Sequence, residues 1–232
     1  MTNNSKIALV TGGSRGLGKD MAMQLATKGL DIIITYNSKK EEANKVVAGI
    51  EAMGRKAVAL QLDVSDYEQY EPFFTEKLTS ALQSTFATDK IDYLVNNAGY
   101  GVYKTFQETT IDDFKNMVNV HLMAAFFITQ NAVKCMNDSG GVVNISSGLA
   151  RFSMSGYAAY AAMKGAIETL SKYQALELGS RKIRVNIVAP GAIETDFGGG
   201  VVRDNEGLNK MLASQTALGR VGLPNDIGSV VA

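Results

Sequence analysis

The segment KIALVTGGSRGLG, residues 6–18, decides the fold of this chain. Its first half is a short apolar run, which predicts a buried strand. Its second half places Gly12, Gly16 and Gly18 where this strand gives way to an amphipathic helix. Glycines let the backbone turn sharply and approach a pyrophosphate, while a helix N-terminus offers unpaired N–H groups and a partial positive charge. The stretch therefore predicts a dinucleotide-binding turn, although glycines of this kind also occur in simple turns. The predicted contacts are Gly12, Ser14, Arg15, Gly16, Leu17 and Gly18.

Five further runs of apolar and β-branched residues follow this first strand. Between them lie longer segments whose apolar residues recur every three or four positions, as in amphipathic helices. The runs are DIIITY (31–36), KAVALQLDV (56–64), IDYLVNNAG (91–99), GVVNISS (141–147) and IRVNIVAPG (183–191). Alternation of strand and helix requires right-handed crossovers and a parallel sheet covered on both faces. We therefore expect a doubly wound, Rossmann-like α/β fold with six buried strands, in which residues 1–232 form a single dinucleotide-binding and catalytic domain.

The composition argues against several other classes of protein. The 232 residues carry 23 basic and 23 acidic side chains, so no basic field favours binding of nucleic acid. The single cysteine, Cys135, cannot form an internal disulfide, which favours a reducing cytoplasm. One His and one Cys supply no set of metal ligands. The polar start MTNNSK is unlike a signal peptide, and no apolar run approaches the length of a membrane span. We therefore expect a cytoplasmic protein whose partner is a small molecule.

Two predicted helices are longer than a crossover between neighbouring strands requires. One covers about residues 111–136 and the other about residues 157–178. The second is rich in alanine and glycine, and small side chains permit close approach of helices. We therefore expect a homo-oligomer, a dimer or a tetramer, while packing of this helix on the sheet alone is the alternative. The stretch DFGGGVVRDNEG, residues 196–207, has the composition of a mobile loop.

Three blocks of sequence together resemble one family. The first is the TGxxxGxG spacing that begins at Thr11, the second is NNAG at 96–99, and the third joins Ser147 to Tyr160 and Lys164 in YAAMK. Further matches are PGxxxT at 190–195 and LGRVGLP at 218–224. With these blocks in this order, the chain resembles the short-chain dehydrogenase/reductase superfamily, in particular its carbonyl and 3-oxoacyl thioester reductases. The resemblance covers essentially the whole chain.

The third block carries the chemistry. Tyr160 and Lys164 are four positions apart and therefore share one face of a helix. An ammonium group near a phenol lowers the pKa of the phenol from about 10 towards working pH, so we expect Tyr160 to exchange a proton with a carbonyl or alcohol oxygen. Ser147, after the fifth strand, can donate a hydrogen bond to the same oxygen. With hydride from a nicotinamide, the trio predicts an oxidoreductase that interconverts a ketone or 3-oxoacyl group and a secondary alcohol.

Two alternative functions remain open. Tyr157 stands seven positions before Lys164, a YxxxxxxK spacing that resembles the enoyl-thioester reductases of the same superfamily, which reduce a carbon–carbon double bond. Those enzymes usually lack the intact TGxxxGxG pattern and the paired serine, so Tyr157 is expected to be a wall of the substrate pocket. The other alternative is a non-catalytic NADP-sensing protein on the same fold, against which the complete trio argues.

His121 is the residue that departs from the family pattern. In the superfamily motif NVNLxGxF, an Asn helps to hold a water that links the catalytic lysine to solvent, and the segment 119–126 places His121 at that position. One hypothesis is that His121 takes part in the proton relay from Lys164, where a pKa near 6.5 would make the relay sensitive to pH. The other is that His121 is a structural residue.

The residues after the second strand indicate the cofactor. Domains that bind NAD place an acidic residue there for the ribose 2′-OH, whereas a 2′-phosphate prefers cations and hydroxyls. Here the strand ends in Tyr36, Asn37 and Ser38, and Arg15 stands in the glycine turn, which favours NADP(H). The family resemblance implies that the cofactor is also contacted by Asp63, Val64, Asn96, Ala98, Gly99, Tyr160, Lys164, Pro190, Gly191, Ile193 and Thr195.

The expected substrate pocket is apolar and aromatic. Its walls come from loops at the carboxyl ends of the strands, where ligands bind in sheets of this kind. The expected lining residues are Tyr100, Val102, Leu149, Phe152, Tyr157, Ile193 and Phe197. A mid-sized apolar ketone and a 3-oxoacyl thioester both fit this lining. The resemblance also implies a further helical portion and a seventh strand after residue 232, which this sequence does not include.

Overall fold

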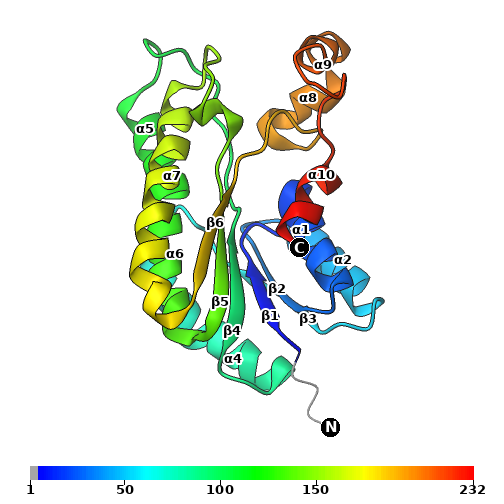
Figure 1. Ribbon diagram of the computed structural model, residues 1–232, viewed down its shortest axis with the longest axis vertical. Helices are drawn as coiled ribbons and strands as arrows, with labels where there is room; N and C mark the ends of the chain where they lie inside the picture. Colours follow the sequence, from blue (N-terminus) through cyan, green and yellow to red (C-terminus); the bar gives the residue numbers. More distant parts are fainter. Residues whose placement is uncertain (1–4) are drawn as a thin grey trace.

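A parallel sheet of six strands forms the centre of the computed structural model, which describes residues 5–232 (Figure 1). The strands are β1 (Ile7–Val10), β2 (Asp31–Tyr36), β3 (Ala57–Gln61), β4 (Ile91–Asn96), β5 (Met136–Ile145) and β6 (Arg184–Val188). Their order is β3-β2-β1-β4-β5-β6, and every neighbouring pair is parallel. The predicted doubly wound α/β fold is confirmed. Within residues 5–232, β3 and β6 each pair with one other strand and are partly exposed, so for this part of the chain the prediction that all six strands are buried is wrong for these two.

Helices cover both faces of the sheet (Figure 1). One face carries α1 (Gly16–Thr27), α2 (Lys40–Glu51) and α10 (Pro224–Val231). The other carries α5 (Ile111–Met117), α6 (Ala124–Ala132) and α7 (Ala158–Leu178), together with α3 (Tyr70–Pro72) and α4 (Thr79–Ala81). Short π-helical stretches, Phe73–Leu78, Leu82–Phe86 and Val118–Met123, follow α3, α4 and α5 and make each run of helix nearly continuous. The two long predicted helices are therefore confirmed, the first ending at Ala132 with one further 3₁₀ turn, Val133–Cys135.

Alternate residues of the central strands fill two separate hydrophobic cores. Leu9 and Ile33 pack towards α3 and α6, whereas Val10 and Ile34 pack towards α1 and α2. Both side-chain rows of β1 and β2 are therefore buried, which explains why the two strands read as continuous apolar runs.

Two other expectations concern the surface of the molecule. The stretch 196–207, predicted as a loop, contains α8 (Val201–Asp204) and the start of α9 (Glu206–Ala213), because Asn205 caps α9 by accepting a hydrogen bond from the Leu208 N–H. The outer face of α7 exposes Ala158 and Ala162, and the predicted homo-oligomer stays a prediction. Most of the polar start of the chain, MTNNSK, lies outside the described residues. Within residues 5–232, no helix combines the length and apolar character that crossing a bilayer demands.

Thr11 joins the carboxyl ends of β1 and β4. Its hydroxyl donates to the Val95 carbonyl and accepts from the N–H groups of Asn97 and Ala98, both at 3.0 Å. The Asn97 amide in turn donates to the carbonyl of Thr11 at 2.8 Å. These hydrogen bonds hold the glycine turn after β1 against the NNAG segment after β4.

We predict that Thr11→Val, which keeps the shape but loses the hydroxyl, lowers the free energy of unfolding by about 2–4 kcal/mol, since it leaves two backbone N–H groups without a partner. Thr11→Ser keeps the hydroxyl and is expected to lose less than half as much. Urea unfolding of the three proteins measures the difference, and equal stabilities of the Val and Ser variants would contradict the role given to this hydroxyl.

Candidate active site and dinucleotide site

The glycine turn after β1 is packed so closely that side chains are excluded at several positions. Gly12 has a positive φ of 66°, and a Cβ there would lie 2.8 Å from the Ala98 Cα. A Cβ on Gly18 would collide with the carbonyl of Gly12. The turn is also tied to β2, because Gly12 N donates to the Thr35 hydroxyl and Gly13 N to the Thr35 carbonyl. These contacts therefore fix the conformation of the turn between β1 and α1.

This turn leaves the first N–H groups of α1 without side-chain partners. Arg15 is the N-cap residue, makes no capping hydrogen bond and is exposed, and the first turn of α1 holds no acidic residue. A phosphate group fits such a helix start, because the N–H groups and the helix dipole both favour negative charge. The residues predicted for a pyrophosphate, Gly12, Ser14, Arg15, Gly16, Leu17 and Gly18, lie together here, and they fit a dinucleotide cofactor.

The end of β2 agrees only partly with the predicted cofactor contacts. Asn37 and Ser38 are exposed beside the glycine turn, as a ribose 2′-phosphate would require. Tyr36 is only 8% exposed and packs in the hydrophobic core below α1 and α2, so its side chain is unsuited to the predicted contact. Asp63 accepts hydrogen bonds from Ser65 through one carboxylate oxygen, which leaves the other oxygen for a further donor.

Ser147, Tyr160 and Lys164 come together as the sequence predicts. Tyr160 and Lys164 lie on the buried face of α7, and Ser147 follows β5. The Lys164 ammonium group donates to the Ile145 carbonyl at 2.7 Å and lies 5.5 Å from the centre of the Tyr160 ring. The Ser147 hydroxyl oxygen accepts from Leu149 N at 3.2 Å, and the same side chain is hydrogen-bonded with Tyr160.

The ionisation of the trio differs from the prediction. Burial raises the pKa of Tyr160 to about 12, and the hydrogen bond with Ser147 lowers it only in part. Burial also lowers the pKa of Lys164 to about 7. The prediction that Lys164 brings the pKa of Tyr160 down to working pH is therefore wrong here, because the lysine faces a carbonyl and both groups are shielded from water. At neutral pH Tyr160 carries its proton.

His121, in the π-helical stretch after α5, lies between Tyr160 and the NNAG segment. Its ring meets the Tyr160 ring edge to face at 5.0 Å, and a Cβ on Gly99 would lie 2.5 Å from the His121 Cε1. Its Nε2 and the Tyr100 carbonyl oxygen are 2.7 Å apart. Because a carbonyl only accepts, Nε2 carries the hydrogen and Nδ1, which is buried without a partner, is an acceptor.

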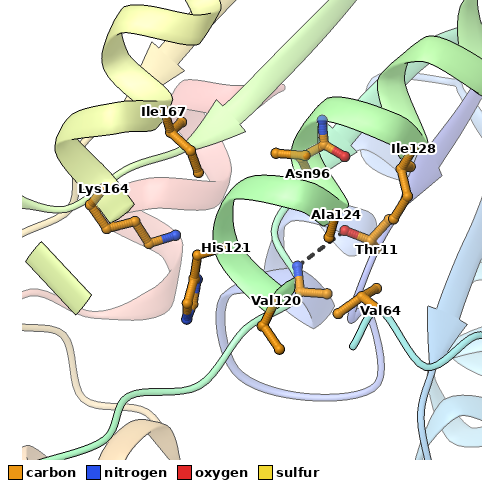
Figure 2. Close-up of a pocket in the computed structure, with 11 residues that line it drawn as sticks. Thr11, Val64, Asn96, Val120, His121, Ala124, Ile128, Lys164 and Ile167 are labelled. Atoms are coloured by element: carbon orange, nitrogen blue, oxygen red, sulfur yellow. Dashed lines mark hydrogen bonds between the residues drawn. The ribbon is translucent and has the colours of Figure 1, made fainter. Parts of the chain in front are cut away.

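The expected pKa of His121 near 6.5 is wrong. Burial, helped by the nearby charge of Lys164, lowers its pKa to about 3, so the imidazole is neutral throughout the physiological range. His121 and Lys164 line a small cavity of about 10 Å³, the size of one water molecule. Figure 2 shows the end of the Lys164 side chain directed towards His121, with Asn96 and Ile128 on the far side of this cavity.

Two of the remaining predicted cofactor residues, Ala98 and Thr195, lie directly against the glycine turn, at Gly12 and Gly16. Thr195 is buried, and a Cβ on Gly16 would lie 3.6 Å from it, so the segment Pro190–Thr195 closes against α1. Asn96 instead has a structural contact, since its amide donates to the Thr129 hydroxyl and to the Asn144 Oδ1 at 2.8 Å each.

Sequence reasoning missed the residues that orient this site. Ser146 donates to the Lys164 carbonyl and to Glu168, which fixes α7 on β5, and Thr11 fixes the NNAG segment. Both are ordinary hydroxyl residues next to recognised motifs. Only their partners, at least 18 positions away in the chain, reveal their roles.

Comparisons with known proteins agree with this geometry. Residues 12–232 match the family model described as Enoyl-(Acyl carrier protein) reductase. The chain is 36% identical to the hydroxynaphthalene reductase-like protein Arp2 of Metarhizium brunneum, over 98% of this chain and 86% of that protein. The chain belongs to the short-chain dehydrogenase/reductase family.

Two solved structures of this family resemble the chain throughout. The reductase LugOII, which is described as catalysing keto-reduction at C1 during lugdunomycin biosynthesis, has a TM-score of 0.92 and 34% identity, over all of this chain and 90% of that one. The angucycline C-6 ketoreductase LanV, solved with bound NADP, has a TM-score of 0.91 and 34% identity, over 97% of this chain and 86% of that one. The predictions of the family and of the fold are confirmed.

The low pKa of His121 predicts how stability depends on pH. Below pH 6.5 the unfolded chain binds a proton at this position that the folded chain does not bind until about pH 3. The stability contribution of the neutral imidazole is therefore complete above pH 6.5 and is lost as the pH falls from there towards 3. Between pH 7 and pH 5 the loss amounts to about 2 kcal/mol.

Urea unfolding at the two pH values, in the wild type and in His121→Asn, measures this contribution. We expect the variant to lose about 2 kcal/mol less than the wild type over the same interval. The comparison uses the change in the free energy of unfolding between the two pH values. A loss of stability that the substitution causes equally at both pH values therefore cancels. Identical pH dependences would show that His121 titrates normally in the folded chain.

Proposed function

We propose that this chain reduces a ketone to a secondary alcohol, with Tyr160 donating the proton to the carbonyl oxygen. NADP is confirmed as the cofactor by relatives solved with it, and bound NADPH supplies the hydride to the carbonyl carbon. As the C–H bond forms, the carbonyl π electrons would move to oxygen, which would take the Tyr160 proton, and a bound NADPH would thereby be oxidised to NADP⁺. The observation that supports this proposal is the approach of Ser147, Tyr160 and Lys164 at the sheet edge beside the glycine turn.

The pKa of Tyr160 suits the reductive direction. A phenol whose pKa is about 12 is fully protonated at pH 7 and can act as an acid without prior ionisation. The reverse reaction needs phenolate, which burial disfavours. The Ser147 hydroxyl, which is hydrogen-bonded with Tyr160, would turn to donate a hydrogen bond to the substrate oxygen as negative charge develops there.

Lys164 would return the proton to Tyr160, with His121 positioned beside it. A lysine whose pKa is about 7 gives up and regains a proton readily at working pH. The cavity that it shares with His121 has room for one water, and the unpaired His121 Nδ1 is an acceptor for that water. His121 thus acts as a neutral positioning residue and not as a titrating relay, and its Nε2–H also holds the Tyr100 loop beneath Tyr160.

The description of the family model favours a second candidate, reduction of a carbon–carbon double bond with Tyr157 as the acid. Tyr157 lies at the N-terminus of α7, and its ring is 6.4 Å from the Tyr160 ring and 5.5 Å from the Tyr103 ring. This places Tyr157 in the wall of the site, while Tyr160 lies next to both Ser147 and Lys164. The geometry therefore supports carbonyl reduction over enoyl reduction and over a non-catalytic role.

Tyr160→Phe is expected to lower kcat with NADPH and a ketone by at least about 100-fold, the usual contribution of a positioned general acid. Tyr157→Phe keeps the ring of the wall residue and is expected to stay within about threefold of the wild type. Turnover of 2-tetralone, with melting temperatures as a control for folding, measures both. The opposite order of the two variants, with an enoyl thioester as the better substrate, would favour the second candidate.

Arg15 is expected to account for much of the preference for NADPH over NADH. Arg15→Ala removes one charge-assisted contact to the 2′-phosphate and should weaken NADPH binding by about 10- to 100-fold, while NADH binding changes little. Arg15→Lys retains the charge and should lose less. Fluorescence titration of both cofactors measures the effect, and an equal loss for NADH would mean that Arg15 contacts another part of the dinucleotide.

A further inference from the structure

Several exposed aromatic side chains lie in the loops on the Tyr160 side of the sheet, and within residues 5–232 they stay largely uncovered. Tyr103 is 68% exposed, Phe152 58%, Tyr100 43% and Phe197 40%. They come from the loops that follow β4, β5 and β6, and Tyr157 completes the set. Large rings left in water at the carboxyl ends of three neighbouring strands are typical of a surface that contacts a ligand. We call these five residues, Tyr100, Tyr103, Phe152, Tyr157 and Phe197, the aromatic collar.

The collar is built in a fixed arrangement. Tyr103 and Tyr157 pack edge to face at 5.5 Å, and Tyr103 also fills the space where Gly156, at a φ of 87°, lacks a Cβ. Lys104 N donates to the Gly156 carbonyl at 3.0 Å, which ties the loop after β4 to the loop after β5. The two loops therefore form one continuous aromatic wall.

Phe197 covers the proton donor. Its ring lies 5.6 Å from the Tyr160 ring, and a Cβ on Gly101 would be 2.6 Å from the Phe197 Cζ. Tyr160 is thereby only 7% exposed, yet a substrate oxygen must come within hydrogen-bond distance of its hydroxyl. The residues after Phe197 are Gly198, Gly199 and Gly200, all with positive φ, so the backbone there can change conformation readily. Another flat ring could therefore take the place of the Phe197 ring above Tyr160.

The charges around the collar do not favour an anionic substrate. Each cation of the three loops is paired with a carboxylate: Lys104 with Asp113 at 2.7 Å, Arg151 with Glu168 at 3.7 Å, and Arg203 with Asp196 at 2.7 Å. The carriers of acyl thioesters bear phosphate groups, which are bound most strongly by free cations near the mouth of the site. The loops supply aromatic rings instead.

We propose that the substrate is a neutral ketone on a flat, fused aromatic ring system, and that its ring replaces Phe197 against Tyr160 while Tyr103 and Phe152 contact its outer edge. This inference rests on the proposed carbonyl reduction by Tyr160. Offset stacking and edge-to-face contacts add to simple apolar burial, so the collar distinguishes an aromatic ketone from a saturated one of the same size.

Two matched ketones test the proposal. 2-Tetralone and 2-decalone have the same ring skeleton and an unconjugated carbonyl, and they differ in the aromatic ring. We expect kcat/KM of the wild type to be at least about tenfold higher for 2-tetralone, and acetoacetyl-CoA to be the poorest of the three. Phe152→Leu and Tyr103→Leu should each reduce the tetralone-to-decalone ratio by about three- to tenfold, chiefly through KM, while Phe152→Tyr should keep it.

The outcomes separate this inference from the proposed function. If Tyr160→Phe is inactive on all substrates but 2-decalone is reduced as well as 2-tetralone, carbonyl reduction stands and the aromatic preference is wrong. A preference for acetoacetyl-CoA would also overturn it. If Tyr160→Phe is as active as the wild type, the proposed function itself fails. Tyr103 is mostly exposed, so its variant remains informative even if Phe152→Leu folds poorly.

Discussion

The close approach of β1 and β4 at their carboxyl ends is the constraint on which the rest of the site depends. Thr11 and Asn97 bind the two strand ends to each other, and Gly12 lies against Ala98 with no room for a side chain. In the strand order of this sheet, β1 and β4 are the pair at which the direction of winding changes, and ligands bind at such points in open parallel sheets. The same contacts set the glycine turn on one side and the NNAG segment on the other. The cofactor cradle and the floor of the catalytic site are therefore parts of one local structure.

The fold could be predicted from the sequence because its signals are local. Buried strands such as β2 read as uninterrupted apolar runs, and α7 carries its buried residues, Tyr160, Lys164 and Ile167 among them, at helical spacing. The spacing of four positions between Tyr160 and Lys164 also predicted that both side chains lie on the same face of α7. Edge strands were the exception, since exposure of β3 and β6 depends on which strand lies next to them, and no local pattern records that.

The electrostatics of the site could not be predicted in this way, because they depend on burial by distant segments. Tyr36 is the last residue of β2, where a cofactor contact is expected, yet its ring packs in the hydrophobic core. His121 has an ordinary sequence environment, but Gly99, Tyr100 and Tyr160 close around it and remove its charge. Burial likewise lowers the pKa of Lys164 to about 7. A lysine near a tyrosine lowers the pKa of the tyrosine only where water or geometry lets the ammonium face the phenol oxygen.

Substrate selection and acid chemistry have a common cause in this site. The rings of Tyr157, Phe197 and His121 pack around Tyr160 and shield it from water, which raises its pKa and keeps the proton on the phenol. This shielding makes it unfavourable for Tyr160 to give up its proton, because the resulting phenolate is a charge in an apolar enclosure. Lys164, 5.5 Å from the centre of the Tyr160 ring, would offset this cost if its ammonium group turned from the Ile145 carbonyl towards the phenol oxygen. A flat aromatic ring seated against Tyr160 would preserve the enclosure during the reaction, whereas a smaller aliphatic ketone would leave room for water beside the phenol. Under the proposed function, the aromatic collar would therefore act on both the binding of the substrate and the protonation state of Tyr160.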